Sequence, residues 1–93
     1  MIYVYIIYSS TYNKYYIGST NNLTRRLKQH NAGENQSTKP YIPYEYSWVT
    51  VKENRKLAEM LERKIKNFKS KKRLREFMEK YESLDFEQLL KEK

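Results

Sequence analysis

The sequence predicts an α+β fold in which a small three-stranded antiparallel β-sheet is flanked by helices. Segments rich in β-branched and aromatic residues, which are typical of strands, occupy 2–8, 14–19 and 45–51. Segments with the periodicity of amphipathic helices fill most of the remaining chain. With 93 residues the chain is too short for two hydrophobic cores. We therefore expect one domain over residues 1–82 and a short helical tail over residues 83–93, packed on that domain or extending it.

The first two predicted strands form a hairpin. The segment IYVYIIY at 2–8 is apolar on both faces, which indicates a central strand covered from two sides. SSTYNK at 9–14 is a turn sequence, and KYYIGS at 14–19 is the second strand. Because few residues separate the two strands, an antiparallel hairpin is the simplest connection.

A helix, a loop and a third strand follow. The segment LTRRLKQHNA at 23–32 predicts a helix, with Asn21 or Asn22 as its N-cap and Gly33 at its end. ENQSTKPYIPY at 34–44 contains both prolines and predicts a polar loop. EYSWVTV at 45–51 alternates as a strand does.

The faces of the first helix follow from a rotation of about 100° per residue. Leu23 and Leu27 define its buried face. His30 then lies close to the centre of that face and Arg26 at its edge, whereas Arg25 points the opposite way. The two neighbouring arginines are therefore not equivalent.

The C-terminal half is predicted to be helical. Segment 54–68 has helical periodicity, and its predicted buried face consists of Leu57, Leu61, Ile65 and Phe68. The same angles put Glu62 at the border of this face and turn Glu59 toward solvent. A basic helical segment at 70–81 and the amphipathic tail SLDFEQLLKEK at 83–93 complete the chain.

Charge and composition narrow the class of partner. The chain has 19 Lys and Arg against 11 Asp and Glu, a net charge of +8, which favours a nucleic acid. The absence of cysteine and the single histidine exclude a disulfide framework, a thiolate zinc site and a histidine metal cluster. A bound metal would have to be a hard cation, Mg²⁺ or Mn²⁺. The apolar run at 1–8 lacks a basic leader and is far shorter than the roughly 20 residues of a membrane helix, so we expect a soluble, cytoplasmic protein.

Five side chains form a candidate site. Tyr5 on the first strand and Tyr16 on the second are expected to share one face of the sheet. We expect the helix edges that carry Arg26, His30 and Glu62 to approach this same face. An arginine, a histidine, a glutamate and two tyrosines would then lie close together.

Short motifs in a fixed order resemble the GIY-YIG nuclease family, in a small stand-alone form. YVY at 3–5 stands where the family has Gly-Ile-Tyr, and YIG at 16–18 matches the second half of the name motif. STNNLTRRLKQH at 19–30 resembles the segment with the family's arginine and histidine, and AEMLERKIK at 58–66 resembles the helix with its metal-binding glutamate. Tyr3 and Val4 depart from the first motif at strand positions that tolerate the change. SKKRLREF at 70–77 lacks the asparagine of many relatives, so a Lys or Arg takes its role or nothing does.

The resemblance implies hydrolysis of a phosphodiester with one metal ion. Tyr5 would act as general base, and the cationic Arg26 would favour its phenolate and grip the scissile phosphate. Glu62 would hold Mg²⁺ or Mn²⁺, which stabilises the departing 3′ oxygen. Tyr16 would hydrogen-bond the phosphate or the water, and His30 would relay a proton or fix Tyr5.

Further residues are assigned to substrate binding. Gly18 would let the main chain approach the substrate closely. The full set is Gly18, Ser19, Thr20, Ser37, Thr38, Lys39, Lys71, Lys72 and Arg73. Structural interpretations stay open beside these: His30 as a hydrogen-bonded helix histidine, Glu62 as a surface partner of Lys66, and the basic run 69–75 as a solvated face.

Two functions are compatible with these patterns. The first is a metal-dependent DNA endonuclease that acts on single-stranded or duplex DNA, as a monomer or as a transient dimer on DNA. The second is a catalytically inactive nucleic-acid-binding module of the same fold. The joint presence of Tyr5, Tyr16, Arg26 and Glu62 favours the enzyme, because a binding module has no need of all four.

Overall fold

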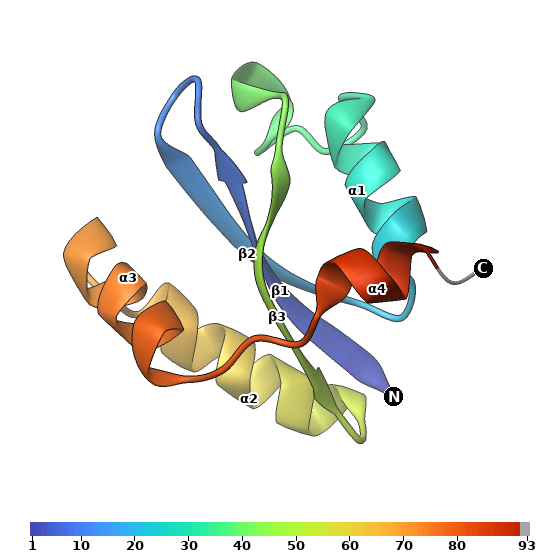
Figure 1. Ribbon diagram of the computed structural model, residues 1–93. Helices are drawn as coiled ribbons and strands as arrows, with labels where there is room; N and C mark the ends of the chain where they lie inside the picture. The colour runs from blue at the N-terminus through green and yellow to red at the C-terminus, as the bar shows by residue number, and fades with distance from the viewer. Residues whose placement is uncertain (92–93) are drawn as a thin grey trace.

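A computed structural model describes residues 1–91 of the chain. Its sheet consists of β1 (Ile2–Ser9), β2 (Lys14–Thr20) and β3 (Glu45–Lys52), all antiparallel and in the spatial order β2-β1-β3 (Figure 1). The predicted α+β fold class, the hairpin and the central position of the first strand are confirmed. The second strand, β2, therefore forms one edge of the sheet.

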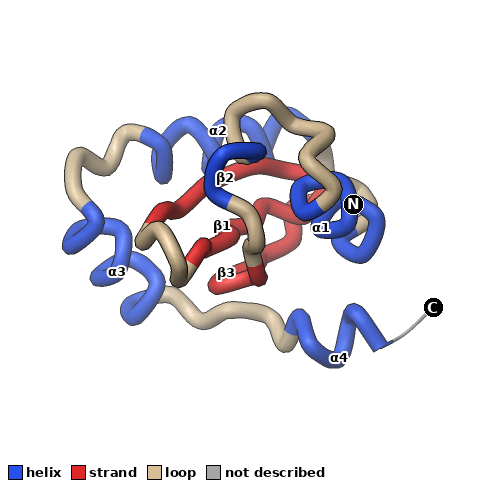
Figure 2. Tube along the Cα trace, turned by 90° about the horizontal axis from the view of Figure 1, so that it is seen from above, coloured by secondary structure: helices blue, strands red, loops and turns tan. Residues whose placement is uncertain are grey.

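The helices cover the two faces of the sheet in pairs. Helices α1 (Leu23–Asn31) and α4 (Phe86–Lys91) lie on one face, and α2 (Arg55–Lys66) and α3 (Lys71–Lys80) lie on the other (Figures 1 and 2). The core on the α2 side contains Val4, Ile6, Trp48, Ala58, Ile65, Leu74 and Phe77. The core on the α1 side contains Tyr5, Ile7, Leu23, Tyr44, Tyr46 and Val49. No helix formed by residues 1–91 has the length and apolar character needed to cross a membrane.

The helix boundaries follow the capping signals in the sequence. The side chains of Asn22, Asn54 and Ser70 each accept a hydrogen bond from the main-chain N–H three residues later, at the starts of α1, α2 and α3. Gly33 follows α1 with a φ of 78°, a left-handed conformation that favours glycine at a helix end. The predicted loop 34–44 contains a short 3₁₀ turn at Lys39–Tyr41.

The buried face of α2 differs from the predicted one. Leu57 is 42% exposed, whereas Ala58 and Ile65 are buried and Leu61 is partly buried. At about 100° per residue, Ala58, Leu61 and Ile65 fall within about 60° of arc, and Leu57 lies well outside it. Ala58 is too small to stand out in a pattern of large apolar side chains, yet it is fully buried. Leu61, Ile65 and Phe68 face the core as predicted, so the buried face is displaced only from Leu57 toward Ala58.

The C-terminal tail packs on the domain. The main-chain N–H of Leu84 donates to the Val49 carbonyl oxygen at 2.8 Å, and Ser83 Oγ accepts from the Val49 N–H at 3.0 Å, so this segment runs along β3. Beyond it, Phe86, Leu89 and Leu90 of α4 pack partly buried against the core on the α1 side. Within the described residues the tail is helical over Phe86–Lys91, whereas 83–85 are not helical, and residues 92–93 lie outside the described part of the chain. The domain boundary at residue 82 stays a prediction.

One contact between β1 and β2 explains the glycine of the YIG motif. Tyr5 and Gly18 are direct partners in the hairpin register. A Cβ atom placed on Gly18 would lie 2.5 Å from the Tyr5 hydroxyl oxygen and 2.7 Å from Tyr5 Cζ. The Tyr5 ring therefore lies across Gly18 toward the edge of the sheet. Gly18 makes room for a side chain of the protein itself, whereas the sequence suggested that it makes room for substrate.

Replacing Gly18 with alanine should lower the free energy of unfolding by about 1–3 kcal/mol, the usual effect of inserting a methyl group into a packed interior. Chemical denaturation measures the change. In a Tyr5→Phe background the loss should be smaller, because the hydroxyl that obstructs the new methyl is gone while the ring remains. Equal stability of Gly18→Ala and the wild-type protein would show that Tyr5 does not occupy this space.

Candidate active site at the edge of the sheet

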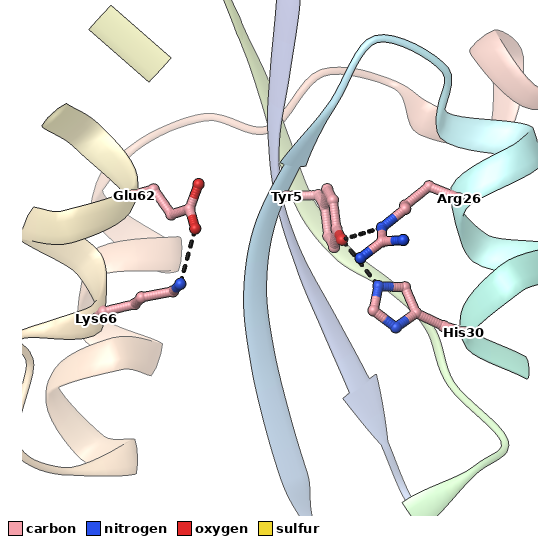
Figure 3. A network of polar contacts seen from close by, with 5 residues as sticks. All are labelled: Tyr5, Arg26, His30, Glu62 and Lys66. Carbon is pink, nitrogen blue, oxygen red and sulfur yellow. Dashed lines mark hydrogen bonds and ion pairs between the residues drawn. The ribbon is translucent and has the colours of Figure 1, made fainter. Parts of the chain in front are cut away.

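Three predicted site residues meet at the hydroxyl group of Tyr5. The Tyr5 hydroxyl oxygen lies 2.8 Å from Nε2 of His30, and Nε of Arg26 donates a hydrogen bond to it at 3.2 Å (Figure 3). Both partners come from α1, one helical turn apart, as the helix angles predicted. Tyr5 and His30 have no exposed surface. The centre of this cluster is therefore shielded from water.

The two neighbouring arginines have different environments, as predicted. Arg26 is partly buried and donates to Tyr5 and, through Nη1, to Oε1 of Gln29 at 3.1 Å. Arg25 is exposed and donates to Oδ1 of Asn21 at 2.8 Å. The guanidinium beside the buried tyrosine is thus that of Arg26 alone.

The environment of Tyr5 favours its neutral form. Burial raises the pKa of the Tyr5 hydroxyl to about 12, and the opposing effect of the Arg26 hydrogen bond and charge is smaller. The nearby Tyr16 and the negative charge of Glu62 raise this pKa further. Arg26 lowers the pKa of Tyr5, the direction expected from the sequence, but desolvation outweighs the cation and Tyr5 stays neutral in the free protein.

His30 is held neutral beside this tyrosine. Burial, and to a smaller extent the charge of Arg26, lowers the pKa of His30 from 6.5 to about 4. The ring is surrounded by aromatic rings, with centroids at 5.8 Å for Tyr5, 5.2 Å for Tyr16 and 6.2 Å for Tyr44. Near neutral pH the imidazole therefore has one nitrogen that donates and one that accepts.

Glu62 approaches from the opposite face of the sheet. Helix α2 packs on the face formed by Val4 and Ile6, whereas Tyr5 belongs to the other face. The prediction that all five residues meet on one face is wrong for Glu62, and Figure 3 shows the edge of the sheet between its carboxylate and the cluster around Tyr5. Its charge still acts on the pKa of Tyr5 across that edge. The site thus has two halves, one on each side of β2.

The half on the α2 side is an open cavity of about 510 Å³. It is lined by Ser19, Glu59, Glu62, Arg63, Lys66 and Asn67. The Glu62 side chain is 19% exposed and forms an ion pair of 2.7 Å with Lys66 Nζ, which confirms the surface pairing left open by the sequence. Lys66 also reaches over the ring of Tyr16, 6.0 Å from its centroid, and so connects the two halves.

Four residues of this cavity were not predicted as site residues: Glu59, Arg63, Lys66 and Asn67. Asn67, the C-cap of α2, lies nearer in the sequence to Glu62 than the segment 70–77 in which the resemblance places an asparagine. Glu59 is exposed, as predicted, but it also lines the same cavity as Glu62 because the buried face of α2 includes Ala58 and Ile65. A predicted buried face that includes Ala58 places Glu59 and Glu62 on the same side of the helix.

The cavity has donors that suit a hard cation. Carboxylate oxygens of Glu59 and Glu62, the Ser19 hydroxyl and the Asn67 amide oxygen are all oxygen donors of the kind Mg²⁺ and Mn²⁺ prefer. Within residues 1–91, no group of three or more His, Cys, Asp or Glu side chains is arranged to hold a metal. An ion here would therefore depend on water and substrate oxygens for the rest of its ligands.

The residues assigned to substrate binding fall into different environments. Ser19 lines the cavity of Glu62, whereas Thr20 is buried and its hydroxyl bonds to the main chain of Asn22. Ser37 and Lys39 are exposed on the loop after α1. Thr38, between them, is fully buried, and its hydroxyl oxygen lies 2.9 Å from Nδ1 of His30. The structure thus places Thr38 with the buried cluster and away from the surface.

The basic residues at the start of α3 are also separated. Lys71 lines a cavity beside β2 together with Lys14, Lys66 and Lys69. Arg73 lines a different cavity, between α2 and α3. Lys72 is exposed. Only Lys71 of the three faces the edge strand next to the candidate site.

The pKa of His30 generates a prediction about stability. Between pH 6.5 and about 4 the unfolded chain binds a proton at His30 that the folded protein does not bind. The neutral, buried His30 therefore contributes to the free energy of unfolding in a pH-dependent way. This contribution is complete above pH 6.5 and should be lost as the pH falls to about 4. Its size is about 3 kcal/mol, since one pKa unit corresponds to about 1.4 kcal/mol.

Denaturant unfolding of the wild-type protein and a His30→Asn variant across this pH range measures the effect. Carboxylate titrations are common to both proteins, so the difference between the two curves should shrink as the pH falls. A difference that stays constant with pH would show that His30 is not held neutral by the fold.

Comparison with known proteins agrees with this geometry. The model of a protein family described as the GIY-YIG catalytic domain matches residues 1–76. The comparisons found no match among curated proteins and none among solved structures. The matched segment includes both strands of the hairpin, α1, α2 and all five predicted catalytic positions. A match over most of the 93 residues shows that the chain belongs to the GIY-YIG family, whose members are typically endonucleases.

Proposed function

We propose that this protein is a divalent-metal-dependent endonuclease that hydrolyses phosphodiester bonds of single-stranded or duplex DNA. The observation that carries the proposal is the partly exposed Glu62 carboxylate in its cavity at the edge strand, beside the Tyr5 hydroxyl that contacts His30 at 2.8 Å and Arg26 at 3.2 Å. A proton acceptor, a phosphate-binding cation and a carboxylate for a metal are thereby gathered around one strand. The family's endonuclease character supports the same activity.

The proton transfer is coupled through Tyr5. Because the pKa of the buried hydroxyl is raised to about 12, a free phenolate is scarce near neutral pH. Tyr5 therefore takes a proton from the attacking water while it passes its own proton to Nε2 of His30. An O–H bond of the water and one of Tyr5 break, and an O–H bond on Tyr5 and an N–H bond on His30 form. The negative substrate phosphate favours the imidazolium that results.

Arg26 connects this step with substrate binding. In the free protein its guanidinium covers the Tyr5 hydroxyl, which has no exposed surface. A phosphate group offers the guanidinium a charged, bidentate partner, which is stronger than a neutral phenol. Turning Arg26 toward the phosphate would open the Tyr5 hydroxyl to the attacking water. Substrate binding and exposure of the base are thus linked.

Glu62 serves as the metal ligand in this proposal, with the other oxygen donors of its cavity beside it. A bound Mg²⁺ or Mn²⁺ supplies Lewis-acid stabilisation of the departing 3′ oxygen. Lys66, which pairs with Glu62 in the free protein, is released to contact the phosphate backbone or Tyr16. The protein acts on DNA as a monomer or as a transient dimer, and we place it in the cytoplasm.

The DNA strand is proposed to run along β2. A cavity of about 260 Å³ is lined by Lys14, Lys66, Lys69 and Lys71, which we call the basic path, and it adjoins the Glu62 cavity at Lys66. Tyr15 lines the same path and offers an aromatic ring for a base. Positive charge and an aromatic ring beside the carboxylate are what a phosphodiester strand would require.

The proposal is tested by incubating the protein with labelled single-stranded and duplex DNA in Mg²⁺, Mn²⁺ or EDTA. Cleavage that EDTA abolishes supports the enzyme. Tight binding with no cleavage under any of the metal conditions would instead identify an inactive nucleic-acid-binding module.

The Glu62→Gln variant should stay folded and lose metal-dependent cleavage by at least about a hundredfold, because the substitution removes the metal ligand's charge and little volume. DNA binding should be kept, since a negative charge near the phosphate is lost. Glu79→Gln, on the exposed surface of α3, is the matched control and should cleave normally. Near wild-type cleavage by folded Glu62→Gln would exclude Glu62 as the ligand. Circular dichroism confirms folding.

The affinity of the protein for DNA should fall as the salt concentration rises, and the lysines of the basic path should account for part of this salt dependence. A Lys69→Gln/Lys71→Gln variant should reduce the slope of log affinity against log salt by about 1.5, since each phosphate contact contributes about 0.7–0.9. Lys52→Gln/Lys56→Gln removes the same charge at the opposite end of α2 and should change the slope less (Figure 1). Equal slopes for the two variants would exclude the path along β2.

A further inference from the structure

The only histidine of the chain is buried between two hydroxyl groups. Nε2 of His30 lies 2.8 Å from the Tyr5 hydroxyl oxygen, and Nδ1 lies 2.9 Å from Oγ1 of Thr38. A hydroxyl group can donate or accept, and so can either nitrogen of a neutral imidazole, depending on the tautomer. The distances alone therefore leave the position of the ring proton open. The remaining partners of the two hydroxyl groups decide it.

The Tyr5 hydroxyl has to donate to His30. Tyr5 has no exposed surface, so its hydroxyl proton needs an acceptor within the protein. Arg26 can only donate to it. Among the contacts that the structure of residues 1–91 gives for this hydroxyl, Nε2 of His30 is the one acceptor. Nε2 must therefore be without a proton, and the ring proton must be on Nδ1.

The Thr38 hydroxyl completes the chain in the same direction. Nδ1–H donates to Oγ1 of Thr38, and the Thr38 hydroxyl donates in turn to the main-chain carbonyl oxygen of Asn35, at 3.4 Å. The polar protons of Tyr5, His30 and Thr38 in this chain then each have an acceptor. In the opposite arrangement Nε2–H would donate to Tyr5, and the Tyr5 proton would be buried without a partner.

The loop that carries Thr38 is fixed to α1. The Asn31 side chain donates to the Tyr44 carbonyl at 3.0 Å and accepts from the Tyr44 N–H at 2.7 Å, which ties the end of the loop to the helix. The Asn35 carbonyl accepts the N–H groups of Thr38 and Lys39, at 3.2 and 2.9 Å. These bonds hold the Thr38 hydroxyl against His30, which has Tyr5, Tyr16, Tyr44 and the charged Arg26 as its other neighbours.

We propose that Thr38 is a positioning residue that keeps the ring proton of His30 on Nδ1, so that Nε2 is free to accept the proton of Tyr5. The catalytic consequence rests on the proposed nuclease function. When the proton moves, the O–H bond of Tyr5 breaks and an Nε2–H bond forms, while Nδ1–H stays bonded to Thr38. The opposite tautomer would present Tyr5 with a second donor and block this step.

The tautomer can be measured in the free protein, without metal or DNA. Because the chain has one histidine, NMR of protein labelled with ¹⁵N-histidine reports His30 alone. Near neutral pH we expect Nδ1 to be protonated and Nε2 to be bare. Thr38→Val removes the acceptor at nearly the same volume and should shift the ring toward the Nε2–H tautomer. Thr38→Ser should restore the wild-type spectrum, and Thr11→Val in the exposed hairpin turn is the control.

Cleavage assays then separate this proposal from the nuclease function. Thr38→Val should lower kcat at least about tenfold with little change in KM, and Thr38→Ser should recover most of the loss. A wild-type ring protonated on Nε2, or an unchanged tautomer in folded Thr38→Val, would overturn the positioning role even if the protein cleaves DNA. Should Thr38→Val fail to fold, Thr38→Ala, which also removes the acceptor, takes its place with the same expected shift toward the Nε2–H tautomer, and an unchanged tautomer in it overturns the positioning role. The expected tautomers without cleavage by any variant would reject the nuclease function alone.

Discussion

The position of the Tyr5 hydroxyl across Gly18 is the constraint on which the candidate site depends. Tyr5 lies in the central strand, and a side chain at the paired position of β2 would force its ring away from the sheet edge. Because position 18 has no side chain, the hydroxyl reaches the place where Arg26 and His30 of α1 can bond to it. Packing of Tyr46 against the ring, at 5.5 Å between centroids, holds it there. The tyrosine and glycine of the two half-motifs thus form one structural unit.

The edge position of β2 explains how residues from two faces can serve one reaction. A central strand would have a neighbour on each side and would separate the two layers of helices completely. At the edge, long side chains pass around a single strand, as Lys66 does when it pairs with Glu62 and also approaches the ring of Tyr16. The strand order β2-β1-β3 is therefore a condition for the site as well as a feature of the fold.

Much of the fold could be predicted because its signals are local. Alternation, helical periodicity and the caps Asn22 and Gly33 depend on neighbouring residues, and the same holds for the contrast between Arg25 and Arg26. The predictions that were wrong or incomplete concern features that depend on packing between distant segments. The face of α2 is set by the small Ala58 against the sheet, and the extra residue in β3 near Ser47 turns Tyr46 and Trp48 to opposite faces despite their even spacing. The burial of Thr38 likewise depends on a loop folding back onto α1.

The structure also changes which residue distinguishes an enzyme from an inactive binding module. Tyr5, Arg26 and His30 have structural roles, because their hydrogen bonds satisfy polar groups inside the core on the α1 side. A module without activity would keep them to remain folded, so their joint presence is weaker support for catalysis than the sequence suggested. Glu62 differs, since it is partly exposed and its pair with Lys66 on the surface of one helix contributes little to stability. A glutamate that the fold does not need, lining a cavity with other oxygen donors beside the Tyr5 cluster, is therefore the strongest structural support for a metal-dependent reaction.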